Sequence, residues 1–342
     1  MIIQSSQLVN NPKLSLVIAT YNQVKFIEQT VKSALVQVCS FDYEILVADD
    51  GSNDGNRELL RKLQEENPDR MKLIFNDKNV MVTRNYVNAI REARGEYVAT
   101  LDGDDIFLRT DVFQQYCDFL DEHKDVSIVH AGFKQFDNNS QQVVATRKDW
   151  KSPLLEESGK LAVYDFLMQK YPFYPLGSTN CFRRKEYIEG CEKYPEIIDE
   201  SWNFGEGTIL NVAMLMVGKY GYINKVFSQY RILNSSLSHF EGDAEKHYKF
   251  WQTYLFVKIQ SAISVGLGNN QIKDVFLQME HDLFRQAAVY KLYGLYGSSL
   301  TEFDRRYEGF DWYKGLLKKL KVKKFMLPLL HAAYSFKKAI LH

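Results

Sequence analysis

The sequence predicts an α/β protein in which a mostly parallel sheet is flanked by helices. Short apolar segments rich in Val, Ile and Leu recur through roughly the first hundred residues, as expected for strands that are buried on both faces. Between them, apolar residues recur at three- and four-residue spacing, which is typical of amphipathic helices. Because strands that alternate with helices form βαβ units, we expect these strands to be parallel.

Four strands are predicted in the N-terminal part of the chain, and they lie at Leu14–Ala19, Tyr43–Ala48, Met71–Phe75 and Tyr97–Leu101. Helical segments separate them. The first helix follows Asn22, which we expect to be its N-cap; the second includes Leu59–Leu63, and the third covers roughly residues 81–93. Ligands of such sheets bind beyond the carboxyl ends of the strands, so the polar residues that follow each strand are candidate site residues.

Three of the predicted strands end in polar residues: Thr20, Tyr21 and Asn22; Asp49 and Asp50; and Asp102, Gly103, Asp104 and Asp105. The last group places three carboxylates within four residues, and such a cluster repels itself unless a cation neutralises it. Oxygen ligands of this kind suit Mg²⁺ or Mn²⁺. A solvated acidic turn would have the same composition. The expected convergence of all three groups at one sheet edge favours the cation site.

The pattern changes after about residue 125. Further strands are predicted at Val126–His130, Gln142–Thr146, Gly221–Ile223 and Val226–Arg231, and helices at Gly207–Val217, Tyr248–Ser264 and Ile272–Tyr293. We therefore expect a first domain over residues 1–238, with halves of about 14–124 and 125–238, and a helical C-terminal region over residues 239–342.

Composition excludes several classes of protein. The formal net charge is zero, so no overall field favours a nucleic-acid partner. The four cysteines form no CxxC pair and have no zinc-site spacing, which indicates reduced thiols. The N-terminus has no signal-peptide pattern, and no apolar run approaches the ~18 residues that span a bilayer. We expect a cytoplasmic protein.

Three ordered motifs resemble those of the family 2 glycosyltransferases, and they lie at Ser15–Asn22, Val47–Asp54 and Gly95–Asp105. The resemblance covers roughly residues 14–235. It implies a GT-A fold with a Rossmann-like sheet, and an inverting enzyme that uses a nucleotide-diphosphate sugar, here a UDP-sugar, with Mn²⁺ or Mg²⁺. It also implies a glycan or lipid-linked acceptor in the synthesis of a surface polysaccharide.

The resemblance assigns roles at the donor site. Tyr21 would stack on the nucleobase, Asp50 or Asp49 would accept the uracil N–H, and Asp102 would hold the ribose hydroxyls. Asp104 would ligate the metal, supported by Asp105, so that the ion stabilises the departing diphosphate. The expected donor-binding set is Thr20, Tyr21, Asn22, Asp49, Asp50, Arg84, Asp102 and Gly103.

Inversion also needs a carboxylate that takes the proton of the acceptor hydroxyl. By resemblance this base lies in an acidic motif that opens a helix, and Glu206 directly precedes the helix predicted from Gly207. Asp199 and Glu200 are the alternatives. Glu206 also fits a helix N-terminal acid that interacts with the helix dipole. Leu233 departs from the family pattern, which commonly has His at that position.

Two further hypotheses remain. A catalytically inactive nucleotide-sugar-binding or scaffold protein of the same fold would share the donor motifs. Separately, the segment Lys314–Lys338 interleaves lysines with apolar residues. That pattern is typical of a basic amphipathic helix in peripheral contact with an anionic membrane, here the inner face of the cell membrane, or of a solvated lysine face.

Overall fold

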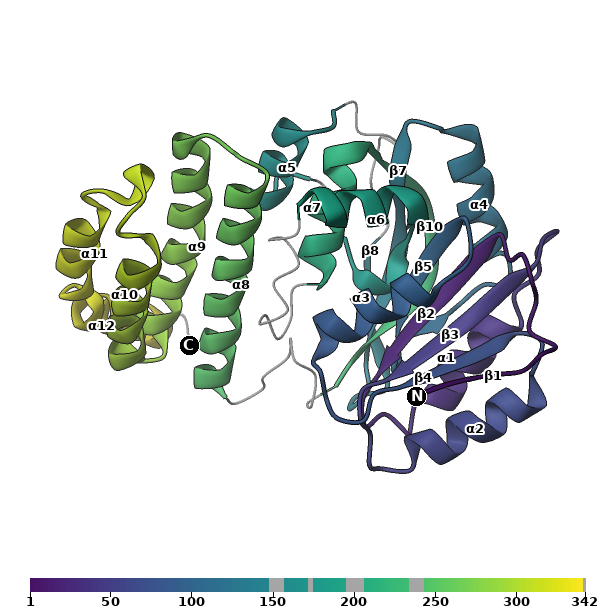
Figure 1. Ribbon diagram of the computed structural model, residues 1–342. Helices are drawn as coiled ribbons and strands as arrows, with labels where there is room; N and C mark the ends of the chain where they lie inside the picture. Colours follow the sequence, from purple (N-terminus) through teal and green to yellow (C-terminus); the bar gives the residue numbers. More distant parts are fainter. Residues whose placement is uncertain (148–156, 172–174, 195–205, 234–242, 341–342) are drawn as a thin grey trace. The chain divides into compact units, whose positions relative to one another are not determined.

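The computed structural model describes residues 1–147, 157–171, 175–194, 206–233 and 243–340 (Figure 1). The chain divides into two compact units: Met1–Phe166 with Lys170–Leu233, and Leu167–Gln169 with Asn234–His342. The domain boundary expected after residue 238 lies outside the described residues.

The first unit is built on a ten-stranded sheet. Its strands are β1 (Ile2–Gln4), β2 (Leu14–Thr20), β3 (Tyr43–Asp49), β4 (Met71–Phe75), β5 (Tyr97–Asp102), β6 (Ile106–Phe107), β7 (Val126–Asp137), β8 (Gln142–Arg147), β9 (Asn180–Arg183) and β10 (Lys219–Ile232). Their order is β1-β4-β3-β2-β5-β9-β7-β10-β6, with β8 beside β7. The four strands β4, β3, β2 and β5 are parallel, and β7 and β10 run in the same direction beyond the antiparallel β9. The prediction of a mostly parallel sheet is confirmed.

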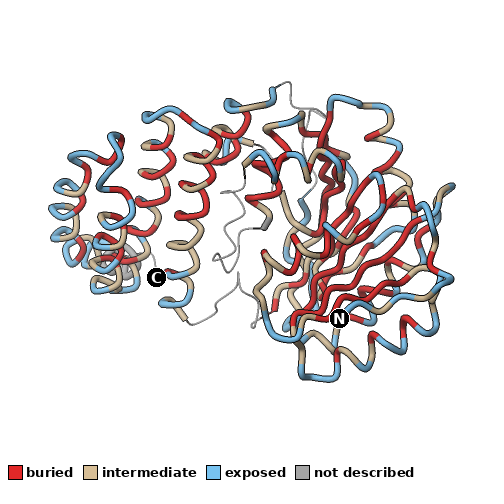
Figure 2. Tube along the Cα trace, viewed as in Figure 1, coloured by how far each residue is buried: buried red, intermediate tan, exposed pale blue. Residues whose placement is uncertain are grey.

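Helices cover both faces of this sheet (Figure 1). They are α1 (Ile27–Leu35), α2 (Asn56–Glu66), α3 (Val82–Glu92), α4 (Val112–Glu122), α5 (Lys160–Leu167), α6 (Arg184–Lys193) and α7 (Glu206–Val217), with the short 3₁₀ helix η1 (Gly177–Thr179). Apolar residues of α1, α2 and α4 share one core with Leu14, Leu16 and Ile18 of β2. Val17 lies between these residues along β2, so its side chain is on the opposite face of the sheet. It is also fully buried but is not part of that core. Figure 2 shows the resulting block of buried strands between helices with exposed outer sides.

The predicted N-terminal strands are confirmed as β2, β3, β4 and β5, since fully buried strands are continuous apolar runs. The two short strands predicted around Gly221 and Val226 are one strand, β10, with an irregularity in pairing between Ile223 and Val226. The prediction of Asn22 as a helix N-cap is wrong. Phe26 is the N-cap of α1, because the Asn22 side chain instead accepts a hydrogen bond from the Asn53 N–H (2.9 Å).

The second unit is helical, as predicted. It contains α8 (Ala244–Ser264), α9 (Asn269–Val289), α10 (Tyr293–Tyr307), η3 (Asp311–Tyr313), α11 (Leu316–Lys324) and α12 (Leu327–Ile340). The helix predicted to continue to Tyr293 ends at Val289, and Lys291 has a positive φ of 59° at the break. Aromatic rings from three elements form the core of this unit, with Phe276 in contact with Phe303, Tyr307 and Trp312. Within the part of the chain described, no helix is long and apolar enough to cross a membrane.

A buried polar network fixes α7 against the sheet. The Asn211 side chain accepts hydrogen bonds from Tyr220 Oη and from His130 Nε2 (2.9 Å), and its Nδ2 donates to the Gly207 carbonyl (2.6 Å). The Ser127 hydroxyl donates to the Met214 carbonyl (2.8 Å) further along the helix. These contacts hold the first turn of α7 at a defined position on β7 and β10.

The network makes the first unit sensitive to acid. Burial lowers the pKa of His130 from 6.5 to about 4, so the unfolded chain binds more protons than the folded one between these values. Stability contributed by neutral His130 is therefore complete above pH 6.5 and falls as the pH drops towards 4. We expect wild type to lose about 2 kcal/mol more than His130→Gln between pH 7 and pH 5. Urea unfolding at the two pH values measures the difference, and equal losses would contradict the assignment.

Candidate active site

The polar residues that follow β2, β3 and β5 meet at one edge of the sheet. The three strands are adjacent and parallel, with Thr20 paired to Asp49 and Ala19 to Asp102. Main-chain hydrogen bonds continue beyond the strands, from the Asp50 N–H to the Thr20 carbonyl and from the Gly103 N–H to the Ala19 carbonyl (2.9 Å each). The structure therefore brings these three groups together, as the strand order predicts.

Two of the loops at this edge are joined by hydrogen bonds. The Asn22 N–H donates to Ser52 Oγ (2.8 Å), and the Val24 N–H donates to Asp54 Oδ2 (3.0 Å). Tyr21 lies within this linked segment, yet its side chain remains 46% exposed. An exposed ring on a loop held by its neighbours presents a face on which a planar ligand can stack.

The two adjacent aspartates after β3 have different surroundings. Asp49 is fully buried and accepts hydrogen bonds from the Ser52 N–H (3.0 Å), Asn56 Nδ2 (2.8 Å) and Arg57 Nε (2.6 Å). Burial alone would raise the pKa of Asp49, but these hydrogen bonds hold it below its usual value. Asp49 is thus enclosed by its own loop.

Asp50, in contrast, uses a single carboxylate oxygen in its described contacts. Its Oδ1 accepts hydrogen bonds from the Val80 N–H (2.8 Å) and from Asn76 Nδ2 (3.0 Å). These two hydrogen bonds orient the carboxylate, and neither of them is made to Oδ2. Of the two aspartates, Asp50 is the better placed to accept a hydrogen bond from a ligand.

Asp102 is held by two hydroxyl groups. Tyr86 Oη donates to Oδ1 (2.6 Å), and Ser178 Oγ lies 3.1 Å from both Oδ2 and the Asp102 N–H. Burial raises the pKa of Asp102, and the two hydroxyl hydrogen bonds act in the opposite direction. Tyr86 is not among the site residues predicted from the sequence, although it lies two residues after Arg84.

Asp104 and Asp105 complete the acidic cluster. Asp105 is buried; its Oδ1 accepts the Arg231 N–H (2.8 Å), and its buried Oδ2 has no hydrogen-bond partner within the described structure. Burial, followed by the charge of Asp102, raises the pKa of Asp104 to about 7, and burial with the charges of Asp104 and Asp102 raises that of Asp105. The raised pKa values mean that the protein compensates the ionised form of this cluster only weakly, so a bound cation would favour it.

A divalent ion suits this cluster. Among the described side chains there is no group of three or more His, Cys, Asp or Glu residues that could hold a metal ion. One or two carboxylates are nevertheless the usual protein ligands of Mg²⁺, which keeps several waters and binds substrate phosphates. The oxygen-only donors and the orphaned Asp105 Oδ2 fit such an ion.

Gly103 is required by the close approach of two loops. A Cβ at this position would lie 2.4 Å from Gln23 Oε1 and 2.7 Å from the Thr20 Cβ. The Gly103 carbonyl also accepts a hydrogen bond from Thr30 Oγ1 (2.9 Å) on α1. The glycine thus lets the acidic loop lie directly against the loop after β2.

Arg231 holds the acidic loop from the side of β10. Its Nε donates to the Asp104 carbonyl (2.8 Å), and its other nitrogens donate to Asn138 Oδ1 and Gln29 Oε1 (3.2 Å each). Its charge also lowers the pKa of Asp104. These contacts, which Arg231 makes to a main-chain carbonyl and two side-chain amides, support a structural role for it.

Other predicted residues are placed only in part. Arg84 is half-buried in the first turn of α3, and Glu206 is the first residue of α7. The side chain of Glu206, together with Asp199 and Glu200, lies outside the described residues. A small cavity of about 20 Å³ is lined by both Asp102 and Gly207, so the acidic cluster and the start of α7 border the same space.

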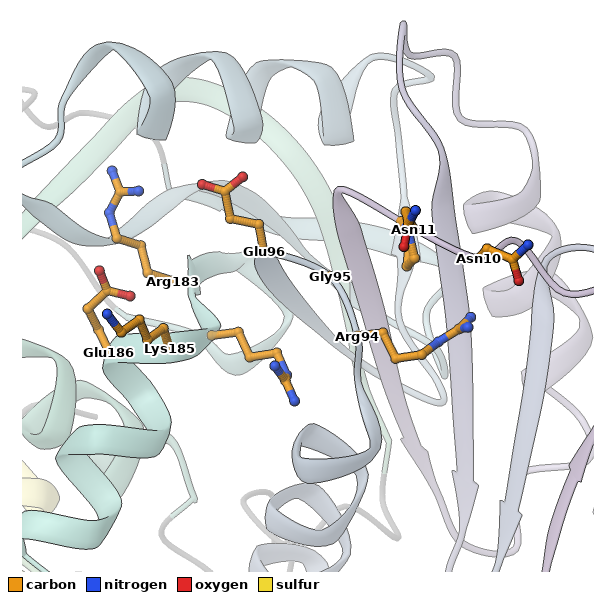
Figure 3. A pocket seen from close by; sticks show the side chains of 10 residues that line it. Asn10, Asn11, Arg94, Gly95, Glu96, Arg183, Lys185 and Glu186 are labelled. Atoms are coloured by element: carbon orange, nitrogen blue, oxygen red, sulfur yellow. The ribbon is translucent and has the colours of Figure 1, made fainter.

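The larger cavity lies elsewhere. It measures about 510 Å³ and is lined by Asn10, Asn11, Pro12, Arg94, Gly95, Glu96, Arg183, Arg184, Lys185 and Glu186 (Figure 3). Residues 10–12 precede β2 and residues 94–96 precede β5, so the cavity lies at the amino ends of these strands, opposite the carboxylates. Residues 183–186 lie at the end of the antiparallel β9 and the start of α6. Arg94 within it forms an ion pair with the buried Glu44 (2.6 Å), which is a structural contact.

Comparisons with known proteins agree with this fold. The model of glycosyl transferase family 2 matches residues 15–189, just over half of the chain. The chain therefore belongs to glycosyl transferase family 2, and it is a glycosyltransferase. The resemblance of its three motifs to that family is confirmed.

The similarity to individual relatives and solved structures extends over more of the chain than the family model does. An uncharacterized glycosyltransferase of Nostoc, alr2836, is 27% identical, covering 69% of this chain and 70% of its own. The GalNAc(5)-diNAcBac-PP-undecaprenol beta-1,3-glucosyltransferase of Campylobacter jejuni is 27% identical, covering 71% and 72%. The crystal structure of S. aureus TarS 1-349 in complex with UDP-GlcNAc has a TM-score of 0.64 and 17% identity, covering 95% of this chain and 92% of that one. The fold is that of the GT-A glycosyltransferases.

The contrast between Asp49 and its neighbour is testable. Asp49→Asn removes the negative charge opposite Arg57 in a buried setting, and we expect the free energy of unfolding to fall by about 3 kcal/mol. Chemical denaturation measures this change. Asp77→Asn, at an exposed position just beyond β4, is the matched control and should leave stability within about 0.5 kcal/mol of wild type. A stable Asp49→Asn protein would contradict the structural role.

Proposed function

We propose that this protein is an inverting glycosyltransferase that transfers a sugar from a UDP-sugar to a hydroxyl of a glycan or lipid-linked acceptor during surface-polysaccharide synthesis. The observation that carries the proposal is the meeting of Tyr21, Asp50 and the Asp102–Asp105 cluster at the carboxyl edge of β2, β3 and β5. Two comparisons support it: a structure of similar fold is a complex with UDP-GlcNAc, and a relative is named for an undecaprenol-linked substrate.

The donor would lie across the ends of β2 and β3. The exposed Tyr21 ring offers a stacking surface for the base, and Asp50 offers Oδ2 to the uracil N–H. Asp102, oriented by Tyr86 and Ser178, accepts hydrogen bonds from ribose hydroxyls. Thr20, Asn22, Asp49 and Gly103 shape these loops, and Arg84 is proposed to contact the nucleotide.

Asp104, supported by Asp105, would hold Mn²⁺ or Mg²⁺. When bound, the ion supplies positive charge to the diphosphate as it leaves. Arg231 contributes by holding the Asp104 carbonyl and the Asp105 carboxylate. These contacts keep the acidic loop in one conformation before the donor binds, so less ordering is required on binding.

Glu206 is the proposed base. Its backbone position at the start of α7 is fixed by the hydrogen bond from Asn211 Nδ2 to the adjacent Gly207 carbonyl. A carboxylate there would take the proton of the acceptor hydroxyl as the oxygen attacks the anomeric carbon opposite the diphosphate. Glu200 and Asp199 are the alternative bases.

Nucleotide binding tests the metal role of Asp104. We expect Mn²⁺ to raise the affinity of wild type for UDP by at least about tenfold, and Asp104→Asn to remove this gain while metal-free binding persists. Isothermal titration calorimetry with and without Mn²⁺ measures both affinities. Asp118→Asn, on the exposed side of α4, should behave as wild type. A gain that survives in Asp104→Asn would move the ion to another residue.

Turnover tests the base. Glu206→Gln should lower kcat by roughly 10²–10⁴-fold, the usual contribution of general base catalysis, and leave UDP affinity unchanged. Transfer assays over a set of UDP-sugars provide the measurement, with Glu189→Gln on the exposed surface of α6 as the control. Normal turnover would assign the base to Glu200 or Asp199. A wild-type protein that binds UDP yet consumes no donor would instead be an inactive nucleotide-sugar-binding protein.

A further inference from the structure

The last two helices are attached to the second unit along one side. Leu316, Leu320 and Leu327 are buried, and Lys323 forms an ion pair with the buried Glu280 (2.7 Å). In α12, His331 Nδ1 donates to the Ala288 carbonyl of α9 (2.9 Å). These contacts define the inner side of α11 and α12 and anchor both helices to α9.

The opposite side carries large apolar side chains that are open to solvent. Val322 is 62% exposed, Phe325 81%, Met326 50% and Leu329 73%; we call these four residues the outer stripe. The outer row consists of Lys318, Val322, Phe325 and Leu329, which are spaced at steps of four, three and four residues. The inner row has the same spacing and consists of Leu316, Leu320, Lys323 and Leu327. Because Phe325 keeps helical dihedral angles between the two helices (φ −67°, ψ −15°), the two rows lie on opposite sides of a nearly continuous helical path.

The outer stripe lies in a strongly basic segment. Residues 312–342 contain eight lysines and no aspartate, glutamate or arginine. Lys318, Lys319 and Lys321 are exposed beside the stripe, and none of the three has an ion pair within the described structure. The stripe thus combines bulky apolar groups with unneutralised positive charge.

We propose that the outer stripe and its lysines bind the surface of an anionic lipid bilayer, with α11 and the start of α12 lying in the plane of the interface. Apolar side chains flanked by lysines match the acyl boundary and the anionic headgroups of such a surface. A second copy of this chain would place like charges against each other, and a nucleic acid would leave the apolar stripe unused. The proposal deepens the proposed function, because it would place the enzyme at the surface where a lipid-linked acceptor resides.

Flotation of the full-length protein with lipid vesicles tests this surface. We expect wild type to float with phosphatidylcholine vesicles that contain about 30% phosphatidylglycerol, and much less with pure phosphatidylcholine. Binding should weaken at about 0.5 M salt, because salt screens the lysines.

Two variants separate the apolar and the charged contributions. Phe325→Glu with Leu329→Glu should abolish flotation, and Lys318→Ala with Lys321→Ala should weaken it by about fivefold for each lysine removed. Val143→Glu with Val144→Glu is the matched control, since these valines of β8 are 48% and 54% exposed; it should float as wild type. Circular dichroism confirms that each variant is folded.

Three results would overturn the proposal. The first is equal flotation on neutral and anionic vesicles, and the second is unchanged flotation of the Phe325→Glu, Leu329→Glu protein. The third is a wild type that does not float but forms a dimer in analytical ultracentrifugation, where the same double variant is a monomer. The last result would assign the stripe to a second copy of the chain. UDP calorimetry on the same proteins keeps the two proposals distinguishable, because donor binding depends on the first unit and flotation on the stripe.

Discussion

The crowding of three carboxylates at the end of β5 is the constraint around which the first unit is arranged. Burial raises the pKa values of Asp102, Asp104 and Asp105, and repulsion from neighbouring carboxylates adds to the rise at Asp104 and Asp105. The chain must therefore hold in place groups that would otherwise separate into water. It does so with neutral donors and a single guanidinium rather than with close ion pairs. Asp102 is held by two hydroxyls, and Asp105 by a main-chain N–H of β10. This arrangement orients the carboxylates, and under the proposed function their oxygens would hold a divalent cation.

The loops around the acidic cluster are also held in defined positions. The loop after β2 can approach the acidic loop only because position 103 has no side chain, and the loop after β3 is stabilised from within by the buried Asp49. The two neighbouring aspartates therefore differ in role: Asp49 supports the fold, and Asp50 is the one that the proposed function assigns to the donor. The proposed acceptor side depends on α7, which the Asn211 network fixes to β7 and β10.

Different contacts stabilise the second unit. Its stability depends on an aromatic core around Phe276 and on buried leucines of α11 and α12, and these account for one side of the terminal helices. The exposed apolar stripe contributes nothing to that core. Large side chains that a fold leaves in water are unusual when they gather on one helical face beside lysines, and the proposed bilayer contact supplies a physical reason for them.

Much of the first unit could be predicted from the sequence alone, because buried parallel strands are continuous apolar runs and their ends are marked by polar residues. The strands from Leu14 to Asp102 and the edge at which their polar ends meet follow from that local pattern, and the resemblance of three ordered motifs indicates the family. Only the tertiary structure decided the roles of particular side chains. Ser178 contacts Asp102 across 76 residues of chain, and Arg231 contacts Asp105 across 126. The same holds for the antiparallel insertion of β9 between β5 and β7. Contacts between residues so distant in sequence leave no periodic signal, since they depend on how whole elements pack together rather than on the local order of apolar and polar residues.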